Sequence, residues 1–156
     1  QVVDAVDIPV IGAGGVGDGR SIAAMFALGA QGVQCGTIFL TAEECPVPAS
    51  YKQRVLAASD TDTIVTGRSQ RDPVRALVNP MLAQYLQLEQ TNGPGAELHA
   101  VADGSFAKAV EDGDREHGTP MAGEVAGMMT TIRPVKEIIT TLFGQAREVA
   151  AQLKIE

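Results

Sequence analysis

Long apolar runs, cysteines and aromatic residues are scarce in this chain of 156 residues, whose aromatic content is 4%. No apolar run approaches the roughly 18 residues of a membrane span, so we expect no membrane partner. There is also no basic segment followed by an apolar one, as a signal peptide has. Two cysteines do not make a disulfide framework, because Cys35 lies in an apolar run and Cys45 in a proline-flanked loop. A reducing cytoplasm is therefore the expected location.

Positive charge is also in short supply. The chain has 12 Lys and Arg against 19 Asp and Glu, which gives a formal net charge of −7. This excess of acid argues against nucleic acid or an anionic membrane as the main partner. The length is enough for one domain with a modest core. We expect no metal site.

Glycine is concentrated in one stretch, "IPVIGAGGVGDGRS" at residues 8–21. Gly12, Gly14 and Gly17 spell G-x-G-x-x-G after an apolar run. This pattern has three interpretations: a Rossmann dinucleotide loop, another kind of phosphate site, or a tight turn that binds nothing.

The surrounding pattern predicts a βαβ unit. Residues 8–12 are typical of a strand buried on both faces. Asp18 is a credible N-cap for a helix over 19–28. The run "GVQCGTIFL" at 32–40 predicts a second buried strand, interrupted by Gly36 and Thr37. Such units form parallel sheets.

A Rossmann site also needs an acidic residue near the end of the second strand. The nearest acids, Glu43 and Glu44, lie well beyond it, so that fingerprint is incomplete. The interpretation as another kind of phosphate site uses both glycine loops. Gly14–Gly15 and Gly36–Thr37 would meet at one carboxyl edge of the sheet. Exposed N–H groups and a helix N-terminus there favour a phosphate. The loops after strands seven and eight of a (β/α)8 barrel are arranged in this way.

The chain resembles the FMN-dependent nitronate monooxygenase and enoyl-acyl-carrier-protein reductase II family. The resemblance rests on residues 8–44 and on the ordered segments "YKQRVLAASDTDTIVTGRS", "PVRALVNP", "AVEDGD" and "GTPMAGEVAGMM". It implies an α/β fold, the C-terminal part of a TIM barrel with strands seven and eight, followed by a mainly helical segment. We divide the chain into the last two βα units at 1–45, a helical and loop insertion at 46–130, and an amphipathic helix at 131–156. The insertion includes a flavin-side segment at 118–129 and one short strand candidate at 63–65.

The resemblance also implies the cofactor site. Gly14, Gly15, Gly36 and Thr37 would hold the FMN phosphate, while Met121, Ala122 and Gly123 would line the flavin pocket. The implied set of contacts is completed by Ala13, Gln34 and Glu124. NAD(P)H is the implied reductant, and the substrate would be a small molecule or an acyl thioester.

Three positions depart from the family pattern. Glu124 stands where Gln is usual, Arg71–Asp72 where a Gly-His pair is common, and His117 where Asn or Gly is usual. A carboxylate at residue 124 would be unfavourable beside an electron-rich reduced flavin unless it is protonated or turned away. We interpret His117 and His99 as exposed loop residues rather than catalysts.

The family's catalytic histidine belongs to a Gly-Gly-His segment before strand seven, which this chain does not contain. We therefore assign no catalytic residue and expect the 156 residues to need a missing N-terminal barrel portion; a homodimer stays open. The leading function is an NAD(P)H-dependent enoyl reductase. The alternatives are a nitronate monooxygenase that uses dioxygen, and a non-catalytic phosphate-binding or assembly module.

The C-terminal helix is the clearest in the sequence. One apolar stripe combines Val135, Ile138, Ile139, Leu142, Phe143, Ala146, Val149 and Leu153. Charged residues of both signs fall outside it, as expected for an amphipathic helix that packs on the exterior of a barrel. We expect Ile139 and Leu142 to be buried in that contact.

Overall fold

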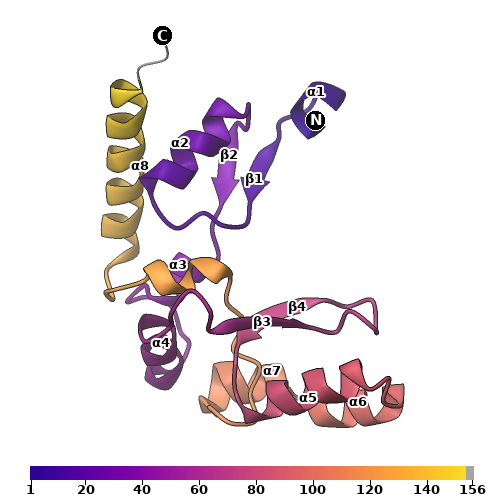
Figure 1. Cartoon of the computed structure of the whole chain (residues 1–156). Coiled ribbons are helices and arrows are strands. Elements are labelled where there is room, and N and C mark those ends of the chain that lie inside the picture. The colour runs from indigo at the N-terminus through magenta and orange to yellow at the C-terminus, as the bar shows by residue number, and fades with distance from the viewer. Residues whose placement is uncertain (154–156) are drawn as a thin grey trace.

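The computed structural model describes residues 1–153. Figure 1 shows an upper part, with two strands and the long C-terminal helix, above a lower part built of a hairpin and short helices. In chain order the elements are α1 (Val2–Ala5), β1 (Ile11–Ala13), α2 (Gly19–Ala27), β2 (Gly32–Gln34), α3 (Thr37–Leu40), α4 (Ala49–Leu56), β3 (Thr63–Thr66), β4 (Val74–Leu77), α5 (Pro80–Gln90), α6 (Gly95–Ala102), α7 (Ser105–Ala107), the π-helix η1 (Lys108–Asp112), the 3₁₀-helix η2 (Glu124–Met128) and α8 (Val135–Gln152).

The predicted βαβ unit is present in the upper part, but its first strand runs over Ile11–Ala13 instead of 8–12, and its end residues are exposed rather than buried. Strands β1 and β2 pair in parallel, with Ile11 opposite Gly32 and Ala13 opposite Gln34. Asp18 caps α2 as expected, and its side chain accepts a hydrogen bond from the Ser21 N–H. The fold is α/β, and the described residues contain two separate two-stranded sheets rather than a closed one.

The second strand is shorter than predicted. It ends at Gln34, and Thr37–Leu40, which we assigned to the same strand, form α3 instead. Thr37 and Ile38 are both buried there. A short buried apolar run does not distinguish strand from helix by its periodicity, which explains the error. Gly36 therefore lies at the point where the strand has ended and a helix begins.

Residues 46–130 contain a β-hairpin in addition to the predicted helices and loops. Strand β3 covers the predicted 63–65 and pairs antiparallel with β4, which the sequence analysis did not identify. An isolated bridge joins Ala76 of β4 to Met121. The hairpin thereby places the start of the 118–129 segment along its edge.

The C-terminal helix α8 packs against α2, which runs obliquely to it (Figure 1). Ile138, Leu142 and Ala146 are buried, as the stripe predicts. The expectation for Ile139 is wrong, because its side chain is 43% exposed. Among the described residues, α2 is the main neighbour of α8, and the buried positions of the stripe are confined to one row. Of the predicted range 131–156, residues 154–156 lie outside the described residues.

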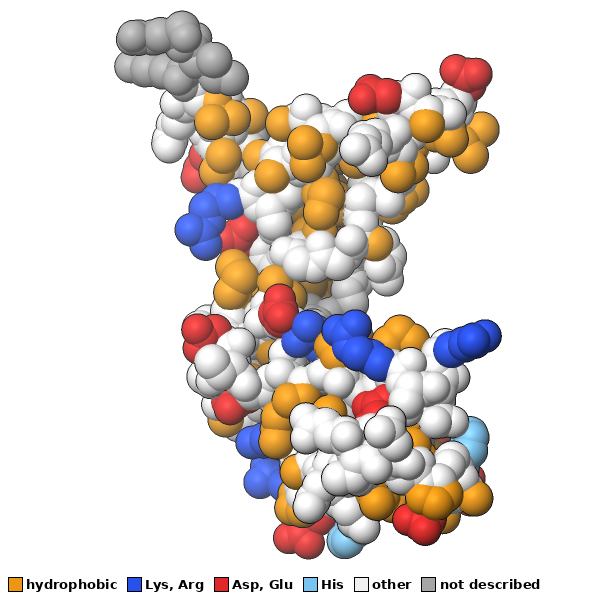
Figure 2. Space-filling model, turned by 45° about the vertical axis from the view of Figure 1, so that its right-hand side comes forward, with side chains coloured by type: hydrophobic (Ala, Val, Ile, Leu, Met, Phe, Trp, Pro, Cys, Tyr) orange, Lys and Arg blue, Asp and Glu red, His pale blue; other side chains and the backbone are white. Residues whose placement is uncertain are grey.

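Much of the apolar surface of the upper part is uncovered. Ile8 is 70% exposed and Ile11 of β1 is 55% exposed. The space-filling view shows apolar side chains spread over this part of the surface (Figure 2). The main core lies instead between α2, α8, α3 and α4, with Ile22, Val55 and Ile138 almost fully buried.

The close contact between α2 and α8 generates a stability prediction. A Cβ on Gly19 would lie 2.3 Å from Gln145 Cβ and 2.5 Å from the Ala146 nitrogen. Gly19→Ala should therefore push the helices apart and lower the free energy of unfolding by about 1–3 kcal/mol. The matched control is Gly144→Ala in α8, where a Cβ meets nothing within 4 Å. That change should add about 0.5–1 kcal/mol by helix propensity. Urea unfolding of both variants measures the difference, and equal effects would contradict the contact.

Candidate functional site

Two glycine loops leave the carboxyl ends of β1 and β2 side by side. Gly14 and Gly15 follow β1 with φ of +87° and +71°, a conformation that favours glycine. A Cβ on Gly14, Gly15 or Gly36 would meet nothing within 4 Å, so open space lies in front of each. Within residues 1–153, the N–H groups of these glycines and of Thr37 donate no hydrogen bond to the chain. The edge therefore presents unpaired donors to open space.

A hydrogen bond connects this edge to a segment more than eighty residues away. The Gly123 N–H donates to Thr37 Oγ1 over 2.9 Å. Thr37 is buried, and a Cβ on Gly123 would lie 3.3 Å from its hydroxyl oxygen. The structure thus brings together Thr37 and Gly123, which the sequence analysis assigned to opposite ends of one ligand.

The backbone before Gly123 is fixed from two sides. The Met121 carbonyl accepts a hydrogen bond of 2.7 Å from the Tyr51 hydroxyl of α4. The Ala122 N–H donates to the Arg75 carbonyl of β4 over 3.2 Å. Burial, with a smaller contribution from Cys45, raises the pKa of Tyr51, so the phenol stays protonated and keeps donating. Ala122 is buried, whereas Met121 is 39% exposed.

The sequence analysis missed both Tyr51 and Arg75. Each acts across the chain, Tyr51 on a residue 70 positions later. No local pattern marks such contacts, although Tyr51 is one of only two tyrosines. The remaining predicted residues, Ala13 and Gln34, are exposed and face each other in register at the ends of β1 and β2.

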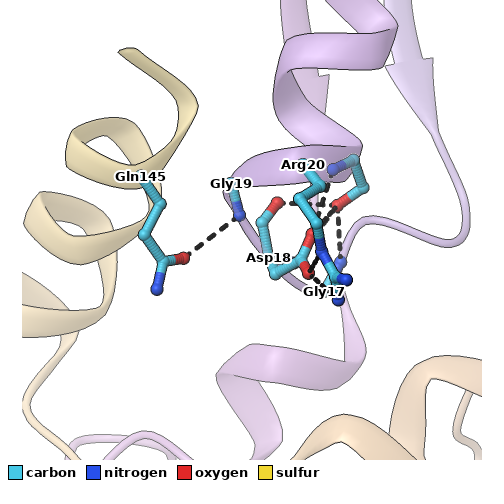
Figure 3. A network of polar contacts seen from close by, with 6 residues as sticks. Gly17, Asp18, Gly19, Arg20 and Gln145 are labelled. Atoms are coloured by element: carbon cyan, nitrogen blue, oxygen red, sulfur yellow. Dashed lines mark hydrogen bonds and ion pairs between the residues drawn. The ribbon is translucent and has the colours of Figure 1, made fainter. Parts of the chain in front are cut away.

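The N-terminus of α2 is already occupied by its own cap (Figure 3). Asp18 Oδ1 accepts from the Ser21 N–H at 3.0 Å, and Ser21 Oγ accepts from the N–H groups of Gly17 and Asp18. The Gly19 N–H donates to Gln145 Oε1 of α8 at 3.2 Å. The N–H groups of Gly19 and Ser21 at the start of α2 are therefore already paired within the chain, whereas those of Gly14, Gly15, Gly36 and Thr37 are not paired within the described residues.

Glu124, the main departure from the family pattern, forms an ion pair. Its Oε1 lies 3.0 Å from Arg75 Nη2, and Arg75 Nη1 also donates to Thr63 Oγ1 at 3.0 Å. Arg75 is therefore held along the hairpin while it neutralises the carboxylate. The charge at residue 124 is compensated within the chain.

The two histidines lie away from the glycine loops. His117 is in a loop, where its Nδ1 is 3.2 Å from Asp114 Oδ2, and its side chain is 65% exposed. Hydrogen bonds from the N–H groups of His117 and Glu116 lower the pKa of Asp114. His99 is exposed on α6 rather than in a loop. Arg71, the second departure, adopts φ of +59° in the turn between β3 and β4, a conformation usual for glycine.

The chain is similar to known proteins over nearly its whole length. The family model described as "Nitronate monooxygenase" matches residues 1–145. A curated protein of Staphylococcus haemolyticus described as "Probable nitronate monooxygenase" is 37% identical over 94% of this chain and 41% of its own length. The structure of FabK from Thermotoga maritima is 40% identical, with a TM-score of 0.92 over 97% of this chain and 48% of that one. Nitroalkane oxidase from Streptomyces ansochromogenes is 30% identical, with a TM-score of 0.78 over 98% and 43%. The chain thus spans less than half the length of these relatives.

The cap of α2 predicts a pH-dependent stability. Burial raises the pKa of Asp18, but hydrogen bonds from Ser21 and Arg20 and the charge of Arg20 outweigh it, so the pKa lies below its usual value. A carboxyl with a lowered folded-state pKa stabilises the fold above its unfolded pKa of about 3.9 and loses this effect as pH falls through the folded value. Asp18→Ala should cost about 0.5–2 kcal/mol at pH 7 and less below about pH 4.

Asp18→Asn is the control, because asparagine caps helices about as well but carries no charge. Its cost should be smaller and should depend less on pH. Urea unfolding from pH 3 to pH 7 measures both variants. A cost of Asp18→Ala that stays constant over this range would contradict the role of the carboxylate.

Proposed function

Because the chain belongs to the nitronate monooxygenase family, we propose that it forms the phosphate side and one ring-facing segment of an FMN site in an oxidoreductase. In this proposal β1 and β2 are strands seven and eight of a (β/α)8 barrel, and chain outside these 156 residues supplies the other strands. Two observations support this arrangement. The chain spans 41% and 48% of two relatives, and Ile8 and Ile11 leave apolar surface uncovered beside β1.

The observation that carries the proposal is the pair of strand-end loops. Gly14 and Gly15 combine positive φ, open space at each Cβ and unpaired N–H groups. The N–H groups of Gly36 and Thr37 lie at the neighbouring strand end, where α3 begins. Backbone amides that converge in this way bind a phosphate without cationic side chains, so the residues present fit the phosphate of FMN.

The chain's own residues would position the cofactor and compensate the charge of the carboxylate near it. FMN supplies the redox chemistry when bound. The four loop residues would hold its phosphate, and the backbone of Met121–Gly123, fixed by Tyr51 and Arg75, would line the ring. Arg75 neutralises Glu124, so the carboxylate does not oppose negative charge on a reduced flavin. No side chain of this chain is assigned a proton transfer.

For the reaction we propose the enoyl reductase type, in which NAD(P)H is the reductant and an enoyl thioester the substrate. The stretch from "AVEDGD" into Met121–Gly123 and the likeness to FabK support this choice. Oxidation of a nitronate with dioxygen is the second candidate, supported by the matching family model and by the curated relative. A non-catalytic phosphate-binding or assembly module is the candidate of another class, and it has no observation specific to it.

The test uses the protein expressed from its complete coding sequence. We expect the near-UV and blue absorbance bands of a flavin, NAD(P)H oxidation with a crotonyl thioester, and little oxygen uptake with a nitronate. The reverse activity pattern would select the monooxygenase. A colourless, FMN-free protein would overturn the proposal. The 156-residue chain alone should show neither activity, since two strands cannot close a barrel.

The phosphate loop predicts a selective loss of cofactor. In the complete protein, Gly15→Val should abolish FMN retention, because the side chain would enter the space in front of the loop amides. Gly104→Val is the matched control, since Gly104 also has positive φ, +65°, with nothing within 4 Å of its Cβ. Both changes carry comparable backbone strain, but only Gly15→Val should release FMN, measured by the absorbance ratio of flavin to protein. Equal retention in both variants would contradict the assignment.

The ion pair of Arg75 with Glu124 predicts a shift in redox potential. Arg75→Gln leaves the carboxylate unpaired and should destabilise an electron-rich flavin by about 1 kcal/mol. For a two-electron couple this lowers the midpoint potential by about 20 mV. Adding Glu124→Gln to Arg75→Gln should restore the potential. Spectroelectrochemical titration of the three proteins checks this, and a potential independent of both residues would place the pair outside the flavin's field.

A further inference from the structure

A pocket of about 150 Å³ opens between the β3–β4 hairpin, helices α5 to α7 and the segment that carries Met121. Its walls are mainly apolar: Val74, Leu82, Ala102, Phe106 and Met121. This volume equals that of a cavity that accepts benzene. It is therefore large enough for an organic group of about six non-hydrogen atoms.

The polar groups in the wall of this pocket are mostly satisfied within the chain. The hydroxyls of Ser105 and Thr119 lie 2.7 Å apart and bind each other. The Thr119 N–H donates to the Ser105 carbonyl at 2.8 Å, and the Gly67 N–H donates to Glu89 Oε2 at 3.1 Å. These groups already have hydrogen-bond partners and need none from a ligand.

Tyr85 of α5 supplies a further polar group in this wall. It lines the pocket and is only 8% exposed, yet within residues 1–153 its hydroxyl forms no hydrogen bond. Burial, together with the carboxylates of Glu89 and Asp72, raises its pKa, so the hydroxyl remains a donor at neutral pH. Asp72, which lines the pocket, makes it unfavourable for an anion. A ligand acceptor in the pocket would give this hydroxyl a hydrogen-bond partner.

Met121 connects the pocket to the proposed cofactor site. Its side chain lines the pocket, and two residues later Gly123 binds Thr37. We propose that this pocket binds the short, uncharged acyl or alkyl end of the organic substrate, with Tyr85 donating a hydrogen bond to a neutral oxygen on it. The identity of the occupant as substrate rests on the proposed function, whereas its size and neutrality follow from the pocket.

The test follows the Met121 methyl group by NMR in the complete protein labelled with ¹³C-methyl methionine, with Met121→Leu to assign the signal. The probes are 2-pentanone, a neutral ketone, and butyrate, an anion with the same number of non-hydrogen atoms. We expect 2-pentanone to shift the Met121 signal saturably and butyrate to leave it in place. The methyl signals of Met25 and Met128, which do not line the pocket, should not move. No shift with 2-pentanone, or equal shifts with both probes, would overturn the proposal.

Three variants refine the test. Tyr85→Phe should weaken 2-pentanone binding by about three- to tenfold, the value of one hydrogen bond. Ala102→Leu fills the pocket and should weaken binding more than tenfold, whereas Ala100→Leu, at an exposed site on the same helix, should not. An unchanged affinity in Ala102→Leu would contradict the assigned location.

Turnover separates this proposal from the proposed function. In an active holoenzyme, Ala102→Leu should lower kcat/KM for the crotonyl thioester and Ala100→Leu should not. If 2-pentanone binds as expected and the protein holds no FMN, the proposed function fails and the pocket's selectivity stands. If the enzyme is active and kcat/KM is the same in both alanine variants, the pocket is not the substrate's.

Discussion

The hydrogen bond from the Gly123 N–H to Thr37 Oγ1 joins the two halves of the candidate site. The strand-end loops belong to the βαβ unit, whereas Met121–Gly123 belong to the segment that returns along the hairpin. Each half is fixed by its own contacts: the parallel pairing of β1 with β2 on one side, and Tyr51 and Arg75 on the other. Thr37 can hold this position only because α3 begins there, which places its side chain against Gly123 rather than along a strand.

Electrostatics in the site are balanced within the chain, although the chain is acidic. The proposed anion-binding capacity of the loops would come from backbone amides, which carry no net charge. The two carboxylates near them are each paired with an arginine, Asp18 with Arg20 and Glu124 with Arg75. A phosphate at the loops would therefore meet little repulsion from these groups, and a departure from the family pattern at residue 124 becomes tolerable because β4 supplies the compensating charge.

Sequence patterns predicted the features that depend on neighbouring residues. The βαβ unit, the Asp18 cap and the buried row of α8 follow from apolar spacing and local capping chemistry, and all are present. The patterns failed where tertiary contacts decide. The run after Gly36 became α3, and β4 was missed because it is defined by its pairing with β3. Ile139 stays exposed because it lies outside the buried row of Ile138, Leu142 and Ala146. Tyr51 and Arg75 act over tens of residues, and the paired state of Glu124 could not be anticipated without them.

The contact between Gly19 and Gln145 has a consequence for how the chain reaches its native state. These residues are 126 positions apart, and α8 makes the most extensive contact with α2, whose Ile22 is fully buried. Pairing of such distant segments must overcome the entropy of closing a long loop, which slows folding. During synthesis, α2 leaves the ribosome long before α8 does, so the part of its apolar face that α8 covers stays open to solvent or to a chaperone until α8 has been made.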